Sequence, residues 1–337
     1  MLITVLAAAN AALLVAGGRG GPEARPGSLR VGVVLDVGGR GDKSFNDLAY
    51  AGLMRARDEL GAEVEYLEPG EGSDREAALR MFASRGFELV IGVGFIFSDD
   101  VTAVAAEYPG VRFACIDYSP RTDSAGRMVP MPPNLTGVRF REEEGSFLVG
   151  ALAGLVTRTK AVGFVGGMDI PLIRRFEAGY REGVAHVCPS CRVLSHFAGV
   201  TATAFRDPGR GRELALAQYG SGADIIFHAS GATGLGVFEA ARATRHFAIG
   251  VDSDQYHEAP GHVLSSMVKY VDNAVFRLVS DAQTGRLRGG IQSLGLAEQG
   301  VGWVDDEHNR ALVPEAARRA VRALADDIVA GSIHVGD

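Results

Sequence analysis

The chain has 337 residues, of which 47% are hydrophobic, and its formal net charge is −7 at pH 7. This length suggests about two domains of roughly 150 residues each, and the apolar fraction is sufficient for two cores. The acidic balance argues against a general nucleic-acid-binding protein, which would carry a basic surface.

The N-terminal segment, residues 1–17, is apolar and rich in alanine and leucine. Such a segment is typical of an export signal and is short for a membrane span, which needs ~20 apolar residues. We therefore expect an exported protein, in the periplasm or on the outer face of the cell membrane. No Lys or Arg precedes the apolar stretch, and Gly18 stands where a bacterial lipoprotein has its lipidated cysteine. Without this cysteine, the alternatives are cleavage after Gly18 without lipidation and a misassigned start codon. The alternative to an export signal is a disordered or core N-terminal segment.

Ten segments rich in β-branched and other apolar residues alternate with segments of helical spacing. Near-continuous apolar runs such as residues 89–93 are typical of strands buried on both faces of a parallel sheet. Between Phe45 and Leu60 the apolar residues fall on one helical stripe. The alternation predicts an α/β fold built from right-handed βαβ units. The expected strands are residues 29–36, 63–67, 88–94, 111–117, 135–140, 161–167, 192–197, 223–229, 247–252 and 263–268.

Ten strands fit two sheets of about five strands each better than one small sheet. A proline-rich loop at residues 123–134 interrupts the series, and we place the first crossing between two lobes just after it. The expected division is a signal-like segment and linker at residues 1–28, a first lobe of residues 29–140 and 253–285, and a second lobe of residues 141–252 and 286–337.

The most informative run, residues 36–46, follows the first expected strand and ends in Asp-Lys-Ser-Phe-Asn. It places a carboxylate, the Phe45 ring and the Asn46 amide at the carboxyl edge of a sheet, where open α/β sheets bind ligands. This set suits a flat polar heterocycle that bears hydroxyl groups. The alternative is a glycine-rich turn in which Ser44 caps the next helix and Phe45 is its first core residue.

Three expected strands of similar form end in Asp36, Asp117 and Asp252. A buried Asp is costly unless it is hydrogen-bonded, so the repetition indicates polar partners at this edge, such as ribose hydroxyls and base N–H groups. Each Asp could instead cap the turn or helix that follows it. Lys269 follows the last expected strand and could reach a ligand hydroxyl or lie in solvent.

Motifs of other functional classes are weak or missing. Residues 231–236 (Gly-Ala-Thr-Gly-Leu-Gly) have the position of a phosphate cradle, but their order is GxxGxG instead of GxGxxG. The loop at residues 38–44 lacks the Gly-Lys-Ser of a P-loop, and the chain has no GxSxG nucleophile elbow. No pair among the eight His has the spacing of a metal site on a helix. We expect no catalysis, no metal and no cofactor.

The chain has three cysteines. Cys115 lies in an expected strand and should be a small buried hydrophobe. Cys188 and Cys191 form a CxxC pair, which could be a redox site or half a zinc site. The chain has no second pair at zinc-finger spacing, and this pair lies mid-chain after an expected helix. In an exported protein a local disulfide is the simplest interpretation.

Several motifs together resemble those of one known family, the basic membrane protein family, over about residues 29–337. Its members are purine nucleoside receptor lipoproteins of bacterial ABC importers. The motifs are Asp-Lys-Ser-Phe-Asn at 42–46, Phe-Arg-Glu-Glu-Glu-Gly-Ser-Phe-Leu at 140–148, Gly-Phe-Val-Gly-Gly-Met at 163–168, His-Ala-Ser-Gly-Ala-Thr-Gly at 228–234, Gly-Val-Asp-Ser-Asp-Gln at 250–255 and Val-Leu-Ser-Ser-Met-Val-Lys at 263–269.

The resemblance implies a type I periplasmic-binding-protein fold, with two doubly wound parallel-sheet lobes joined by three crossings and the ligand in the cleft between them. It implies that Phe45 stacks on one face of a purine and that an aromatic side chain of the other lobe covers the opposite face. Phe227 is the candidate for this second aromatic, with His228 as the alternative. The implied polar contacts are Asn46 and Asp117 to the base edges, Asp252 and Lys269 to the ribose hydroxyls, and assistance from Asp36 and the backbone at Gly231 and Gly234.

The implied function is an extracytoplasmic substrate-binding protein without enzymatic activity. Its lobes would close by hinge motion around a purine nucleoside (adenosine, guanosine or inosine) and present it to the permease subunits of an ABC importer. The chain departs from the family at Gly18, which replaces the lipidated cysteine, and at Ala232, which replaces a common glycine. The alternatives are a nucleoside-acting hydrolase and a cytoplasmic ligand-sensing regulator of the same fold.

Overall fold

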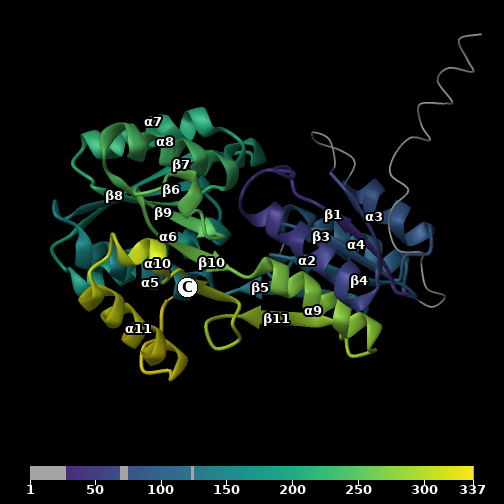
Figure 1. Ribbon diagram of the computed structural model, residues 1–337. Coiled ribbons are helices and arrows are strands. Elements are labelled where there is room, and N and C mark those ends of the chain that lie inside the picture. Colours follow the sequence, from purple (N-terminus) through teal and green to yellow (C-terminus); the bar gives the residue numbers. More distant parts are fainter. Residues whose placement is uncertain (1–27, 69–74, 123–124, 337) are drawn as a thin grey trace, which may run out of the picture.

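The computed structural model describes residues 28–68, 75–122 and 125–336. This part of the chain forms two lobes side by side, each built on a six-stranded sheet with helices on both faces (Figure 1). The doubly wound α/β architecture expected from the sequence is confirmed. The expected export signal lies outside the described residues.

The first sheet has the strand order β11-β5-β4-β3-β1-β2, and all its described pairs are parallel. Helices α2 and α9 cover one face, and α3 and α4 cover the other. The strands are β1 (Arg30–Val34), β2 (Glu63–Leu67), β3 (Leu89–Val93), β4 (Arg112–Ile116), β5 (Leu135–Phe140) and β11 (Gly290–Leu294). The helices are α2 (Phe45–Leu60), α3 (Arg75–Ser84), α4 (Ser98–Glu107) and α9 (Val271–Gln283).

The second sheet has the corresponding order β12-β10-β9-β8-β6-β7, and only the short β12 runs antiparallel to its neighbour among the described pairs. The strands are β6 (Ala161–Met168), β7 (Arg192–Gly199), β8 (Ile225–Ala229), β9 (Phe247–Asp252), β10 (Val263–Lys269) and β12 (Val301–Trp303). The helices are α5 (Glu142–Val156), α6 (Pro171–Val187), α7 (Pro208–Gly220), α8 (Gly234–Thr244), α10 (Glu307–Arg310) and α11 (Glu315–Val329). Short 3-10 turns η1 (Phe95–Phe97), η2 (Ala202–Phe205), η3 (Gly231–Thr233) and η4 (Tyr256–Glu258) follow strand ends.

Within the described residues the chain passes between the two sheets three times: after β5, after β10 and after β11. All ten expected strands are present, whereas β11 and β12 were not anticipated. The division of the chain differs from the expected one at these two crossings. β10 pairs with β9 in the second sheet although residues 253–285 were assigned to the first lobe, and β11 pairs with β5 in the first sheet although residues 286–337 were assigned to the second.

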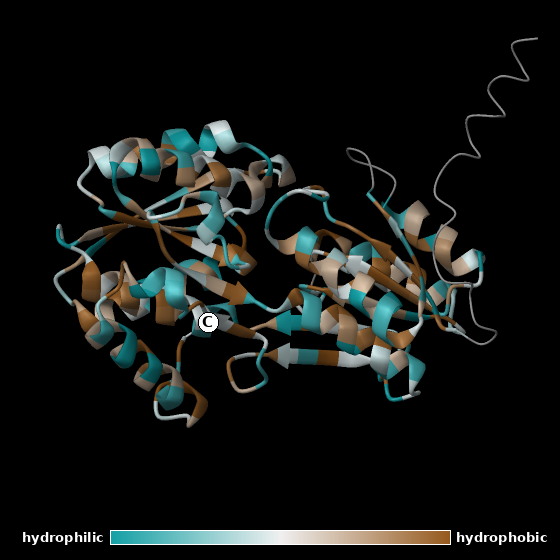
Figure 2. Cartoon of the chain, viewed as in Figure 1, coloured by the Kyte–Doolittle hydropathy of each residue, from teal (hydrophilic) through white to brown (hydrophobic). Residues whose placement is uncertain are grey.

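Each sheet is buried between its helical layers because its central strands are almost wholly apolar (Figure 2). One continuous hydrophobic cluster runs from the α2 and α9 side of the first sheet into the α5 and α6 side of the second. Helices α5 and α6 approach closely because Gly179 and Gly183 of α6 lie against backbone atoms of Glu143 and Phe147, leaving no room for a Cβ. This contact fixes α6 beside the lobe junction.

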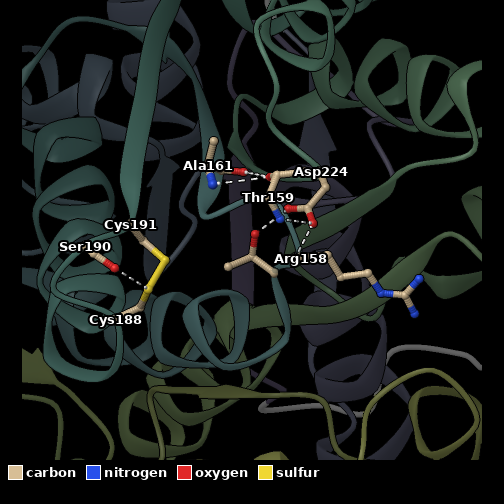
Figure 3. Close-up of a disulfide and its surroundings, with 8 residues drawn as sticks. Arg158, Thr159, Ala161, Cys188, Ser190, Cys191 and Asp224 are labelled. Carbon is tan, nitrogen blue, oxygen red and sulfur yellow. Dashed lines mark hydrogen bonds between the residues drawn. A yellow bond between two sulfur atoms is a disulfide. The ribbon is translucent and has the colours of Figure 1, made fainter.

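The CxxC pair forms the disulfide expected from the sequence (Figure 3). The Cys188–Cys191 bond, with an S–S distance of 2.05 Å, joins the end of α6 to the start of β7. The same figure shows Asp224, whose carboxylate accepts hydrogen bonds from the backbone nitrogens of Arg158 at 2.6 Å and Thr159 at 3.3 Å, in the turn between α5 and β6. Cys115 is buried and forms no disulfide, as expected. None of the helices in the described residues has the length and apolar character needed to cross a membrane.

Candidate functional site

A pocket of about 640 Å³, counting the part open to solvent, lies at the junction of the two lobes. The first lobe contributes Asp36, Val37, Gly38, Asp42, Phe45, Asn46, Phe95 and Asp117. The second lobe contributes Leu172, Ile173, Phe176, Ala202, Phe205, Ala229, Ser230, Gly231, Val251, Asp252 and Lys269.

The loop after β1 is held by side chains of its own residues. The Asp42 carboxylate accepts hydrogen bonds from the backbone nitrogens of Ser44 (2.9 Å), Asn46 (2.8 Å) and Asp47 (3.2 Å), and so stabilises the N-terminus of α2. The Asn46 amide donates to Asp42 at 3.0 Å and accepts from the backbone nitrogen of Asp36 at 2.9 Å. These bonds fix Phe45, between them, at the pocket wall. Ser44 is the N-cap residue of α2, as the alternative had it, but its side chain makes no capping hydrogen bond.

Asp117 directly follows strand β4, and Asp252 is the last residue of strand β9. Both have a left-handed backbone conformation, with φ of 61° for Asp117 and 64° for Asp252. Non-glycine residues rarely adopt this region, and such strain concentrates at functional sites. Asp36 lies at the corresponding position after β1, where its carboxylate accepts from the backbone nitrogen of Val37 at 2.6 Å. The three carboxylates expected at the strand ends therefore do meet at one pocket.

Lys269 is buried, with 1% of its surface exposed, and bridges the lobes. Its Nζ lies 2.7 Å from Asp117 Oδ1 in the first lobe and 3.0 Å from Glu142 Oε1 in the second. Glu142 also pairs with Arg175 Nε at 2.9 Å. Burial alone would lower the pKa of Lys269, but the surrounding carboxylates outweigh it and raise this pKa, so the ammonium stays charged.

The pocket carboxylates are shifted towards their neutral forms. Burial raises the pKa of Asp36 to about 7 and that of Asp252 to about 6, with the Lys269 charge partly opposing the shift at Asp252. Burial also raises the pKa of Asp117, against the attraction of Lys269, and that of Asp42, against its backbone hydrogen bonds. Hydrogen bonds donated to a carboxylate stabilise its charged form and lower its pKa, so a ligand with many donors would offset the cost of burying this wall. Within the described residues, no group of three or more His, Cys, Asp or Glu side chains is arranged to hold a metal ion.

Aromatic rings from opposite lobes flank Lys269. Its Nζ lies 5.1 Å from the ring centroid of Phe45 and 5.6 Å from that of Phe176 on α6, with Phe140 at 4.8 Å. Phe95 of the first lobe and Phe205 of the second approach each other at 6.4 Å between centroids. The pocket thus combines apolar ring surfaces from both lobes with a group of carboxylates.

The two candidates for the second-lobe aromatic do not line the pocket. Phe227 is fully buried in the core, with its ring centroid 5.2 Å from Tyr180 and 5.7 Å from Phe164. It also contacts Phe176, at 6.5 Å, which is the ring that reaches the pocket. Sequence reasoning placed Phe227 at the edge because it is near the end of β8, but its side chain faces the helices that pack on the sheet.

His228 is also fully buried, and its ring lies on the other face of β8 from Phe227. Its Nε2 lies 3.1 Å from Gln255 Oε1 and its Nδ1 3.3 Å from Ser230 Oγ. Burial lowers the pKa of His228 to about 4, so the ring is neutral at pH 7. Of the two glycines expected to assist, Gly231 lines the pocket, whereas Gly234 lies against the His228 ring.

The site residues expected from the sequence did not include Phe95, Phe205, Phe176, Asp42 or Glu142. Phe95 follows directly after the β3 edge, so its position was visible in the sequence. Phe176 could have been suspected from its place in the first turns of α6, which follows a strand end. Glu142 lies in the Phe-Arg-Glu-Glu-Glu run, but nothing in the sequence shows that Lys269 would be its partner.

Comparisons with known family models, relatives and solved structures agree over most of the chain. The model of the Bmp family, described as ABC transporter substrate-binding protein PnrA-like, matches residues 29–335. The CD4+ T-cell-stimulating antigen of Listeria monocytogenes is 33% identical over 327 residues, which cover 90% of this chain and 87% of that protein. Basic membrane protein A of Borreliella afzelii is 32% identical over 309 residues, 90% of each chain. An uncharacterized lipoprotein of Pyrococcus furiosus is 34% identical over 303 residues, 86% and 73% of the two chains.

Among solved structures, a solute-binding protein of an ABC transporter system from Aeropyrum pernix superposes with a TM-score of 0.80 and 32% identity. The match covers 91% of this chain and 92% of that one. The type I periplasmic-binding-protein fold expected from the sequence is thereby confirmed.

Proposed function

The chain belongs to the basic membrane protein family of PnrA-like ABC transporter substrate-binding proteins, and we propose that its ligand is a purine nucleoside held between the two lobes. The family expected from the motifs is confirmed. Its members are substrate-binding proteins and not enzymes, so they bind a small ligand and act with permease subunits in the membrane. The identity of the ligand is the part that we propose.

The observation that carries the proposal is the pair of rings, Phe45 and Phe176, which enter one pocket from opposite lobes beside Lys269. A flat base between two rings gains stacking energy on both faces, and closure of the lobes completes the second face. Stacking of a base on an aromatic side chain contributes ~1–3 kcal/mol. A purine offers more ring surface to such a pair than a pyrimidine does.

The charges of the pocket favour a neutral ligand with many donors. Four carboxyl groups (Asp36, Asp42, Asp117 and Asp252) and one ammonium group (Lys269) are the ionisable groups that line it within the described residues. A nucleoside brings ribose hydroxyls and base N–H groups, which can donate to these carboxylates. A phosphorylated nucleoside would place a negatively charged phosphate beside four carboxyl groups and a single ammonium group. Burying that charge without a cationic partner would cost a large amount of binding free energy.

We assign the polar contacts as follows. Asp252 and Lys269 would bind the ribose hydroxyls, and the backbone at Gly231 and the Asp36 carboxylate would assist. Asp117 and Asn46 would bind the base edges. The Asn46 amide has one N–H left for this role because the other donates to Asp42.

We also propose that the protein is exported and works in the periplasm or on the outer face of the cell membrane. The apolar segment at residues 1–17 supports this proposal, as do the names of two relatives, a lipoprotein and a basic membrane protein. Fractionation of cells that express the full chain would test it. Recovery of the protein in the cytoplasmic fraction alone would contradict it.

Isothermal titration calorimetry tests the ligand. Protein stripped of co-purified small molecules by unfolding and refolding is titrated with adenosine, guanosine, inosine, cytidine, uridine and inosine monophosphate. We expect one-to-one binding of the purine nucleosides, weaker or no binding of the others, and loss of binding in Phe45→Ala and Asp252→Ala. Absence of binding for all purine nucleosides by a folded protein would refute the proposal.

A further inference from the structure

Two of the motifs singled out in the sequence, residues 42–46 and 250–255, touch each other across the lobe junction. Ser253 Oγ of the second lobe donates a hydrogen bond to the backbone oxygen of Lys43 in the first lobe at 2.8 Å. Gln255 Nε2 donates to the same oxygen at 3.0 Å. In the opposite direction, Ser44 Oγ donates to the Asp252 carboxylate. Three hydrogen bonds thus join two short segments that are more than 200 residues apart.

On the first-lobe side of this contact, Lys43 has an unusual backbone conformation and Ser44 has a buried hydroxyl. Lys43 has a φ of 55°, in the left-handed region that non-glycine residues rarely occupy. Ser44 is fully buried, and its hydroxyl does not cap α2 because Asp42 already does so. Neither Lys43 nor Ser44 is among the described residues that line the pocket. The buried Ser44 hydroxyl and the Lys43 backbone oxygen are thus both engaged in the contact between the lobes.

The second-lobe half is held rigidly. Gln255 is buried, with 2% of its surface exposed. Its Oε1 accepts from the backbone nitrogen of Val251 at 2.8 Å and lies 3.1 Å from His228 Nε2. These two contacts orient the amide within the second lobe and leave Nε2 for Lys43. The neutral His228 ring, which does not reach the pocket, thereby acquires a structural role.

We propose that Lys43, Ser44, Ser253 and Gln255 form a latch that holds the two lobes together in the closed protein and adds the same free energy of closure for every ligand. Asp252 connects the latch to the pocket because its carboxylate both lines the pocket and accepts from Ser44. The inference rests on the proposed function insofar as closure is assumed to trap a nucleoside.

The latch should affect the affinity for every ligand through the population of the closed form. The apparent affinity of a ligand that is trapped in the closed form scales with the population of that form. Weakening the latch should therefore lower the affinity for each nucleoside by the same factor, mainly through faster release. A change in a residue that we assign to the base edges, such as Asn46, would instead affect different nucleosides by different factors, and the distance between the lobes separates the latch from a ribose contact, which is common to all three nucleosides.

The test compares two serines of similar local chemistry. Ser253→Ala removes a hydroxyl that donates to a backbone oxygen of the other lobe, whereas the control Ser221→Ala removes one that donates to Ala217 within α7, also at 2.8 Å. Spin labels on the exposed positions of Glu59→Cys in α2 and Glu239→Cys in α8 report the distance between the lobes. The native cysteines do not compete for the label, because Cys188 and Cys191 form a disulfide and Cys115 is buried. Ser44→Ala is a second latch variant.

We expect Ser253→Ala and Ser44→Ala each to weaken adenosine, guanosine and inosine binding by one common factor of roughly 3- to 10-fold, the effect of one lost hydrogen bond. Both should also raise the fraction of molecules with the longer label distance, while Ser221→Ala matches the parent protein. The latch is refuted if both variants keep the parent's label distances, or if their losses differ between nucleosides. Failure of the proposed function looks different, because the parent protein would then bind none of the nucleosides while the latch variants would still lengthen the label distance.

Discussion

The two walls of the pocket are built in different ways. Most of the first-lobe wall comes from one continuous run, residues 36–46, to which only Phe95 and Asp117 are added. The second-lobe wall comes from five separate places: the first turns of α6, the η2 turn, and the ends of β8, β9 and β10. The first wall is thus fixed by local hydrogen bonds within a loop, and the second by how helices pack on a sheet.

The largest expected effect comes from breaking the charge contact that joins the walls. Lys269→Met leaves Asp117 buried without its cation and takes from Glu142 one of its two cations, so that Glu142 keeps only the contact with Arg175. Removal of one partner of a buried ion pair costs ~3–5 kcal/mol, so urea denaturation should show a loss of this size in the free energy of unfolding. The double variant Lys269→Met with Asp117→Asn should regain part of it.

The matched control for this change is Lys160→Met, because Lys160 is an exposed lysine of the same protein. It should change the free energy of unfolding by less than ~0.5 kcal/mol. Equal losses for Lys160→Met and Lys269→Met would show that the buried contact contributes nothing specific.

A second pair of variants tests which second-lobe ring belongs to the pocket. Phe176→Leu removes the aromatic face that flanks Lys269, and we expect a roughly 10-fold loss of nucleoside affinity from the lost ring contact. Phe227→Leu changes a ring that is enclosed in the core, so it should leave the affinity of the folded protein unchanged and lower its stability by ~1 kcal/mol. Calorimetric titration and urea denaturation of both variants decide the matter; a reversed pattern would restore Phe227 as the binding ring.

A third pair compares local structure in the two lobes. Asp42 accepts from three backbone nitrogens at the start of α2, whereas Asp207 accepts from the backbone nitrogen of Arg210 at the start of α7. Asp42→Ala should therefore cost ~1–2 kcal/mol of stability and Asp207→Ala nearer ~0.5–1 kcal/mol. If Asp207→Ala costs more, the first wall does not depend on its loop hydrogen bonds in the way described.

The smallest effect concerns pH. The pKa of Asp36 is raised to about 7 and that of Asp252 to about 6 in the folded protein, above the ordinary value of 3.8. The folded state therefore binds more protons than the unfolded state between about pH 4 and 7, and its stability decreases as pH rises through this window. Around these groups lie Asp42, Asp117 and Lys269, and Lys269 opposes the shift at Asp252.

We expect the melting temperature of the ligand-free protein, measured by calorimetry, to fall between pH 5.5 and pH 8. Asp36→Asn should reduce this fall, because an amide does not titrate. A melting temperature that rises over this range in the parent protein, or a fall that Asp36→Asn leaves intact, would contradict the assignment.

The sequence predicted the first wall well because its chemistry is contiguous. Asp36, Phe45 and Asn46 stand within eleven residues, directly after a strand, so their meeting at one edge needs no knowledge of the tertiary structure. Even here the detailed role of Ser44 was not predictable, since its partner Asp252 lies 208 residues away. The strands themselves were visible because buried parallel strands are apolar throughout.

The second wall was predicted only where a strand end marks it, as at Gly231, Asp252 and Lys269. Phe227 was chosen because it is aromatic and close to such an end, but successive side chains of a strand point to opposite faces, and neither face of β8 opens on the pocket at this position. Phe176 reaches the pocket because α6 packs closely on α5 through Gly179 and Gly183, a contact that the sequence pattern does not reveal. The two short strands β11 and β12 were missed because β11 is an edge strand with mostly polar or exposed residues and β12 has only three residues.

The most direct test of the account is a crystal structure of the protein with inosine bound. We expect the hypoxanthine ring to lie between Phe45 and Phe176 and the ribose hydroxyls to contact Asp252. The backbone oxygen of Lys43 should still accept hydrogen bonds from Ser253 and Gln255. An inosine found outside the pocket, or inside it with the base in contact with neither ring, would contradict the assignment of the site.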